Sequence, residues 1–199
     1  MTDGKNPLIN ITNNGKSNVD LGKILKAYYD APEKYKKSTD RILFLDEESP
    51  DKEDTLARWK HVEDKSVIWV YGKSALNEGL DETYSIDRIM YHEMGHAIDL
   101  DDNYGLRLST NKNIKNLINA YRPSSYNATS GPTFKRYREG IADALSMVAY
   151  KNILDKSTAK IRVPKYENGK NVGYEILGYD EWHKRYYNLA TFLENELNI

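Results

Sequence analysis

The chain contains no cysteine. This absence excludes disulfide bonds, thiolate zinc ligands and cysteine nucleophiles, and it leaves the redox compartment open. No hydrophobic run reaches the roughly 20 residues that a membrane-spanning helix requires. The polar first residues, MTDGKNPLINITNNGKSN, contain no apolar signal-peptide core. We therefore expect no membrane partner and no signal peptide in this chain.

An excess of one charge is also missing. The 29 Lys and Arg residues nearly equal the 30 Asp and Glu residues, which gives a formal net charge of −1. Nucleic-acid-binding surfaces normally carry a clear basic excess, so we expect no nucleic-acid partner. The short basic run at residues 135–138 is explained more simply as a solvated helix face.

The pattern along the chain predicts an α+β fold. Residues 1–17 are rich in Asn, Gly and Lys and are predicted to form a flexible N-terminal arm, followed by a single domain over residues 18–199. Short apolar runs predict two strands, and a hairpin is predicted at 161–177. Apolar residues at helical spacing predict five helices. The predicted strands are 41–45 and 66–71, and the predicted helices are 19–29, 82–100, 111–121, 134–154 and 180–197.

His92-Glu93-Met94-Gly95-His96 is an HExxH motif within a predicted helix. Residues i and i+4 project from one helical face, so both imidazoles can bind one tetrahedral metal ion. Glu93 then lies beside the open metal position, where it can take a proton from an activated water. A packed or solvated histidine is the ordinary alternative, but two of the chain's four histidines fall in this motif. We predict one Zn²⁺ per chain.

A zinc site of this kind needs a third ligand. Glu139, on a later predicted helix, is the first candidate, and Asp143 one turn further can accept the outer N–H of a ligand histidine. Asp99 lies on the same helical stripe as both histidines and is a second supporting candidate. Asp102 is an alternative third ligand in a metzincin-like pattern, but that pattern needs a glycine for its sharp turn where Asp99 stands.

These motifs resemble the gluzincin metallopeptidases, and specifically the anthrax lethal factor family, which includes the secreted bacterial Pro-Pro endopeptidases. The resemblance rests on HEMGHAID (92–99), REGIAD (138–143) and SVIWVYG (66–72), and it extends loosely from residue 41 to the end. It implies a zincin-like fold: a small mixed sheet with an edge strand over the active-site helix, and a helical C-terminal half. It also implies Glu139 as third ligand, with Asp143 as its partner.

The sequence departs from this family at two positions. Pro132 stands where the family has a catalytic tyrosine, so we assign the oxyanion hydrogen bond to Tyr126, with Tyr137 or His183 as alternatives. His61, like His183, is more simply explained as a structural or exposed residue. Leu100 replaces a histidine of the Pro-Pro endopeptidases, so proline specificity is not implied.

The function predicted from these residues is a zinc-dependent endopeptidase acting as a monomer on a protein or peptide substrate. The peptide is expected to add a strand to residues 66–71, with Trp69, Val70 and Tyr71 as substrate-binding residues. The alternatives are a catalytically silent binding module, against which the intact Glu93 argues, and a metal-dependent hydrolase of another bond. The resemblance suggests a secreted or delivered enzyme, whereas the N-terminus suggests a cytoplasmic one.

Overall fold

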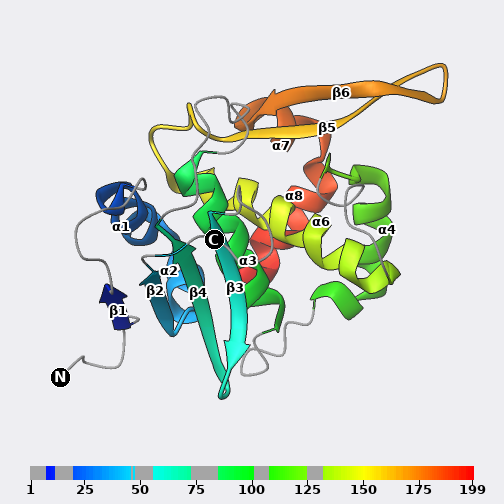
Figure 1. The fold of residues 1–199 in the computed structure, drawn as a ribbon. Coiled ribbons are helices and arrows are strands. Elements are labelled where there is room, and N and C mark those ends of the chain that lie inside the picture. The colour runs from blue at the N-terminus through cyan, green and yellow to red at the C-terminus, as the bar shows by residue number, and fades with distance from the viewer. Residues whose placement is uncertain are drawn as a thin grey trace.

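The computed structural model describes residues 8–11, 20–45, 47, 56–72, 85–100, 108–124 and 132–199. These segments form a four-stranded sheet, a two-stranded sheet and several helices (Figure 1), so the predicted α+β class is confirmed. Among the helices in these segments, none combines the length and apolar character needed to span a membrane.

The larger sheet is mixed, with the strand order β1-β2-β4-β3. Strands β1 (Leu8–Ile11), β2 (Arg41–Leu45) and β4 (Lys65–Tyr71) run parallel, whereas β3 (Ala57–Val62) pairs antiparallel with β4. Strand β3 therefore forms one edge of the sheet. Strand β3 was not predicted, and β1 lies within residues 1–17, which were predicted to form a flexible arm.

Two short helices precede the second strand. Helix α1 (Leu21–Asp30) begins where the Asp20 side chain accepts a hydrogen bond from the Lys23 N–H, a standard N-cap. Helix α2 (Glu33–Lys37) follows, and its Tyr35 is fully buried. The hydroxyl of Tyr35 donates to the Leu145 carbonyl at 2.6 Å and so ties this end of the chain to the helical half.

Helix α3 (Ile86–Leu100) packs against the sheet on one side and against α6 (Thr133–Val148) on the other. The two helices approach closely because Gly95 has no side chain. A Cβ at Gly95 would lie 3.2 Å from the Ala142 backbone and from the Leu145 Cβ. This contact explains why a glycine stands at this position, although glycine within a helix is less favourable than alanine by about 1 kcal/mol.

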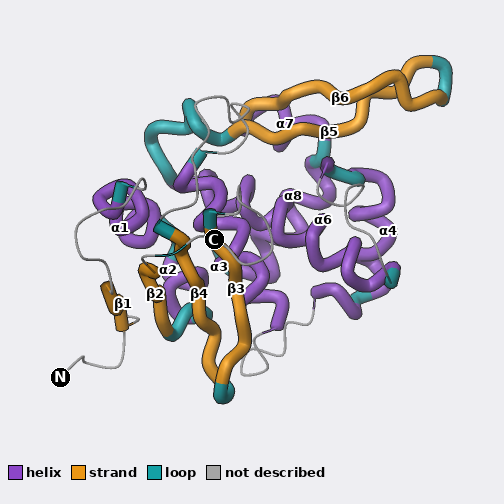
Figure 2. The backbone as a smooth tube through the Cα atoms, viewed as in Figure 1, coloured by secondary structure: helices purple, strands orange, loops and turns teal. Residues whose placement is uncertain are grey.

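Most of the remaining elements pack against α6 (Figure 2). The remaining elements are η2 (Leu108–Thr110), α4 (Lys112–Tyr121), η3 (Ala149–Asn152), β5 (Lys160–Glu167), β6 (Lys170–Gly178), α7 (Tyr179–Arg185) and α8 (Tyr187–Leu197). Strand β6 packs on β5 and α7, and the β5–β6 hairpin extends away from α6 (Figure 2). Strands β5 and β6 form the predicted hairpin. The terminal helix predicted as continuous is instead interrupted at Tyr186, whose backbone angles of −110° and 36° are not helical.

Candidate metal centre

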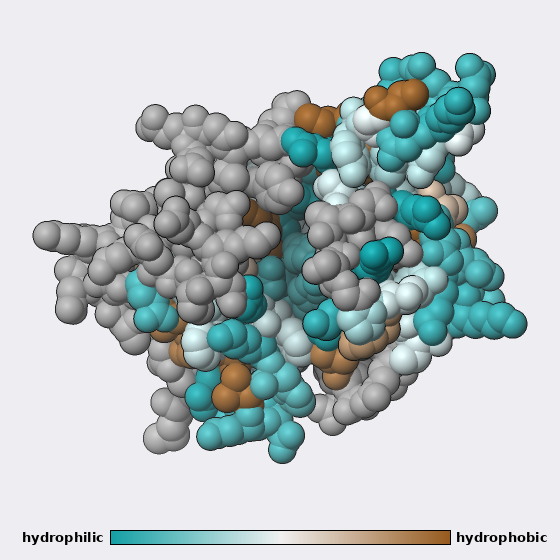
Figure 3. All heavy atoms as spheres, turned by 45° about the vertical axis from the view of Figure 1, so that its right-hand side comes forward, coloured by the Kyte–Doolittle hydropathy of each residue, from teal (hydrophilic) through white to brown (hydrophobic). Residues whose placement is uncertain are grey.

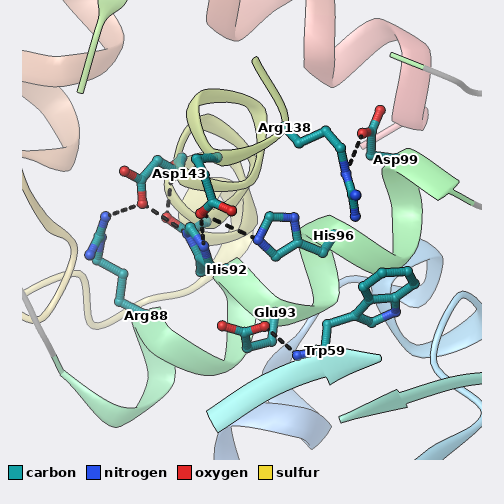
Figure 4. A network of polar contacts seen from close by, with 10 residues as sticks. Trp59, Arg88, His92, Glu93, His96, Asp99, Arg138 and Asp143 are labelled. Atoms are coloured by element: carbon teal, nitrogen blue, oxygen red, sulfur yellow. Dashed lines mark hydrogen bonds and ion pairs between the residues drawn. The ribbon is translucent and has the colours of Figure 1, made fainter. Parts of the chain in front are cut away.

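Helix α3 directs both motif histidines toward α6 (Figure 4). The ring centroids of His92 and His96 are 4.8 Å apart. Glu139 Oε2 lies 3.4 Å from His92 Nε2 and 3.6 Å from His96 Nε2. One ligand atom from each of the three residues lies within 4.8 Å of the others. Two imidazole nitrogens and one carboxylate oxygen form a donor set that zinc accepts, with a fourth position left for water or substrate.

Asp143 lies one turn beyond Glu139 on α6 and holds His92 from the far side of its ring. Its Oδ1 lies 2.9 Å from His92 Nδ1 and accepts a hydrogen bond from Arg88 Nη2 at 2.6 Å. The carboxylate favours the tautomer with the proton on Nδ1, which leaves Nε2 free to bind a metal. Arg88 was not predicted, and its position one turn before His92 on the same helical face was the available signal.

The three candidate ligands form a charged cluster. Burial lowers the pKa of His92, but hydrogen bonds to Asp143 and Glu139 outweigh burial and raise that pKa to about 10. Burial raises the pKa of Glu139, whereas its contacts with His92 and His96 hold the pKa far below its ordinary value. Glu139 is therefore an ionised carboxylate, and a divalent cation at this point would replace the proton on His92 Nε2.

Asp99 does not hold a ligand histidine. Its Oδ1 accepts a hydrogen bond from the Ser109 N–H at 2.7 Å, and its Oδ2 lies 3.8 Å from Arg138 Nε. Within the described segments, neither Asp99 Oδ2 nor His96 Nδ1 has a hydrogen-bond partner. Asp99, predicted as a supporting residue, therefore has no hydrogen bond to a ligand histidine within the described segments. Burial raises the pKa of this carboxyl, which is only 1% exposed.

Glu93 connects the motif helix to the edge of the sheet. Its Oε2 accepts a hydrogen bond from the backbone N–H of Trp59 on β3 at 2.5 Å (Figure 4). This N–H points toward the free edge of β3 and not toward β4, because neighbouring residues of a strand alternate in the direction of their backbone groups. The edge strand beside the motif helix is therefore β3.

The prediction that residues 66–71 form an exposed edge is wrong. Strand β4 is paired with β2 on one side and with β3 on the other, so no peptide can add to it. Trp69 and Tyr71 alternate with Ile68 and Val70, which belong to the hydrophobic core of which α3 also forms part. Trp69 and Tyr71 consequently face away from the motif helix, and Val70 is fully buried.

A cleft of about 570 Å³ opens over the candidate ligands. Its walls come from β3, α3 and α6, and the space-filling view has a hydrophilic hollow near its centre (Figure 3). The residues that line the cleft are Ala57, Arg58, Trp59, His92, Glu93, His96, Lys135, Arg138 and Glu139. Trp59 and Arg138 were not among the predicted site residues; Trp59 was missed because β3 itself was not predicted.

The other candidates lie away from this centre or outside the described residues. Tyr126 and Asp102 lie outside the described residues. Tyr137 hydrogen-bonds through its hydroxyl to the Asn119 side chain. His183 Nε2 lies 2.9 Å from Glu194 Oε1 of α8, which gives it a structural partner. His61 is exposed on β3 and stacks near Trp59, with ring centroids 6.3 Å apart.

No protein-family model matches the sequence, and none of the curated proteins compared with it is similar. The function of the chain is therefore inferred from the residues of the site.

Proposed function

We propose that this chain is a zinc-dependent endopeptidase with a zincin-like fold, of the gluzincin type that the anthrax lethal factor family represents. The observation that carries the proposal is the convergence of three ligand types from two helices. His92 and His96 come from α3 and Glu139 from α6, with ligand atoms within 4.8 Å of one another. If the HExxH pattern were accidental, there would be no reason for a carboxylate from another helix to lie beside its two histidines.

The protein residues divide the chemistry among them. A bound zinc ion supplies Lewis acidity, which polarises the scissile carbonyl and lowers the pKa of the attacking water. Glu93 takes the proton of that water and delivers it to the leaving amine. Asp143 keeps His92 in the tautomer that presents Nε2. Tyr126 remains our prediction for the donor to the oxyanion.

The free edge of β3 is the proposed binding site for an extended peptide. Strand addition supplies backbone hydrogen bonds without regard to side chains, which suits an endopeptidase. Trp59 lies on this edge and lines the cleft, and its N–H contacts Glu93 at 2.5 Å. The peptide backbone would therefore lie within reach of the base, an arrangement that favours a peptide over a small ester or amide substrate.

The proposal is tested by zinc content and peptide cleavage measured on the same samples. We expect about one zinc per wild-type chain, and much less in His96→Ala and in Glu139→Ala. The exposed residues His61 and Glu167 provide matched controls, because His61→Ala and Glu167→Ala remove the same groups outside the ligand set. Both controls should retain zinc.

Each alternative gives a different result. Zinc retention in Glu139→Ala would move the third ligand to Asp102 and overturn the gluzincin assignment. A zinc-loaded wild type that binds peptides without cleaving them would be a binding module. Cleavage of small amides or esters in place of peptides would indicate a hydrolase of another class. A wild type that takes up no zinc would refute the proposal entirely.

A further inference from the structure

Cationic side chains gather on the walls of the cleft. Lys135 and Arg138 line it from α6, one turn apart, whereas Arg58 borders it on β3 with its side chain on the opposite face of the sheet, where its strand partner Trp69 lies. The carboxylates near them are Glu93, Glu139 and, beside Arg138, Asp99; Glu139 is committed to the candidate metal site. A divalent ion would add further positive charge. With such an ion bound, the positive charges at the cleft would exceed the negative ones and favour an anionic group of a substrate.

Arg138 is the cation that reaches from α6 toward the Trp59 ring. Its Cζ lies 5.5 Å from the centroid of the Trp59 ring, so the guanidinium bridges from α6 toward the edge strand. Its side chain is 25% exposed, and its Nε lies 3.8 Å from Asp99 Oδ2 without a hydrogen bond. A peptide added to β3 would pass beside this group.

The pairing with Asp99 leaves Arg138 available for a substrate. A guanidinium has five N–H donors in a fixed fork, and it binds a carboxylate best through two parallel hydrogen bonds. Asp99 directs Oδ1 to the Ser109 N–H at 2.7 Å. Asp99 thus positions Arg138 by charge without taking up its fork, which stays directed toward the cleft that Arg138 lines.

We propose that the cleft selects peptides that carry an Asp or Glu side chain beside the scissile bond, and that Arg138 is the residue that determines this specificity. The inference rests on the proposed peptidase function and names its substrate class. The carboxylate of the substrate binds the guanidinium of Arg138 in a partly desolvated cleft, where the attraction exceeds its value in water. Lys and Arg at the same substrate position are disfavoured by the cleft charge.

The test uses pairs of peptides that differ only by Glu or Gln, with the pair moved through each position on either side of the cleaved bond. A hydrogen-bonded charge pair contributes about 1.5–3 kcal/mol, so the wild type should prefer Glu by roughly 10- to 100-fold in kcat/KM. Arg138→Gln should abolish the preference, and Arg138→Lys should retain part of it because lysine lacks the fork. Arg136→Gln is the matched control: Arg136 lies on the same helix and is exposed.

Binding supplies a readout that does not depend on turnover. In a Glu93→Gln background, fluorescein-labelled Glu and Gln peptides are compared by anisotropy, with and without Arg138→Gln. Tighter binding of the Glu peptide that disappears in the double variant supports the inference. Equal binding and cleavage of the two peptides by the wild type would overturn it. So would a uniform loss on both peptides in Arg138→Gln, which is the outcome for a merely structural contact with Asp99.

The two proposals fail separately. If the wild type cleaves no peptide, the peptidase proposal fails, and the anisotropy ratio still decides whether the cleft selects acidic peptides. If the wild type cleaves peptides with no preference for Glu, the peptidase proposal stands and the assignment of Arg138 is wrong.

Discussion

Replacing Asp143 with asparagine should weaken zinc binding without removing a ligand. Asp143 is 3% exposed, and its Oδ1 contacts Arg88 Nη2 at 2.6 Å and His92 Nδ1 at 2.9 Å. Asparagine keeps the shape and one oxygen acceptor but loses the charge. The Nδ1 proton of His92 then has a weaker partner, so the ring is less basic at Nε2 and less firmly oriented.

The magnitude follows from these two contacts. Loss of a partner of this kind reduces metal affinity by about 10- to 100-fold, which corresponds to roughly 1.4–2.7 kcal/mol. The zinc-free protein should also lose stability, because Arg88 keeps its charge inside the protein while its carboxylate partner is gone. Removal of one member of a buried ion pair costs about 3–5 kcal/mol. Because asparagine keeps one oxygen that can still accept from Arg88, the loss of unfolding free energy in Asp143→Asn should be about 3 kcal/mol or less.

The assay is a competitive zinc titration against a chromophoric chelator, with urea unfolding of the zinc-free protein measured in parallel. Asp99→Asn is the matched control, since Asp99 is also buried beside the site but bonds Ser109 and not a histidine. We expect Asp99→Asn to leave zinc affinity near that of the wild type. Wild-type zinc affinity in Asp143→Asn, or an equal loss in both variants, would refute the role assigned to the Asp143–His92 contact.

Three further perturbations test other parts of the structure. Gly95→Ala should destabilise the protein by up to about 2 kcal/mol. Overpacking against α6 costs roughly 1–3 kcal/mol, which exceeds the gain in helix propensity of about 1 kcal/mol. If urea unfolding showed unchanged stability, the close contact between the two helices would be contradicted. Glu93→Gln should keep its zinc and lose roughly 10²- to 10⁴-fold in kcat on a peptide substrate, and substantial remaining activity would point to another base. Alkaline pH should unfold the protein, because burial raises the pKa of Tyr28 from 10.0 to about 12 and holds those of Tyr35 and Tyr121 well above 10.0. The folded state then binds more protons than the unfolded state above pH 10, so stability falls from there as pH rises, and phenolate absorbance should appear together with loss of the helical CD signal. Titration of all tyrosines near pH 10 in a folded protein would be the contrary result.

Some of the site follows from local sequence alone. The HExxH spacing places two histidines on one helical face whatever surrounds them, because the helix repeat is local. Helix starts at Asp20 and Asn111 agree with the predicted segments, since an N-cap side chain bonds to the next turn of its own helix. The β5–β6 turn at Asn168 and Gly169, with positive φ angles of 51° and 77°, is a local feature of the same kind.

The edge strand could not be predicted from its own residues. The segment ARWKHV carries Arg, Lys and His within six residues, and it becomes a strand because β4 pairs with it. The turn between them has positive φ angles at Glu63 and Asp64, without the usual Asn-Gly signal. Because β3 was not predicted, the edge of the sheet was assigned to residues 66–71. These residues form most of β4, which lies between β2 and β3.

The sequence by itself determined the α+β class, most element positions and the two histidines on one helical face. Only the tertiary structure decided which strand borders the cleft, which face Trp69 occupies, and that Arg88, Trp59 and Arg138 surround the candidate ligands. The physical reason is the range of the interactions. Helix periodicity and capping act within about four residues, whereas strand pairing and the packing of α3 on α6 join residues far apart in the chain.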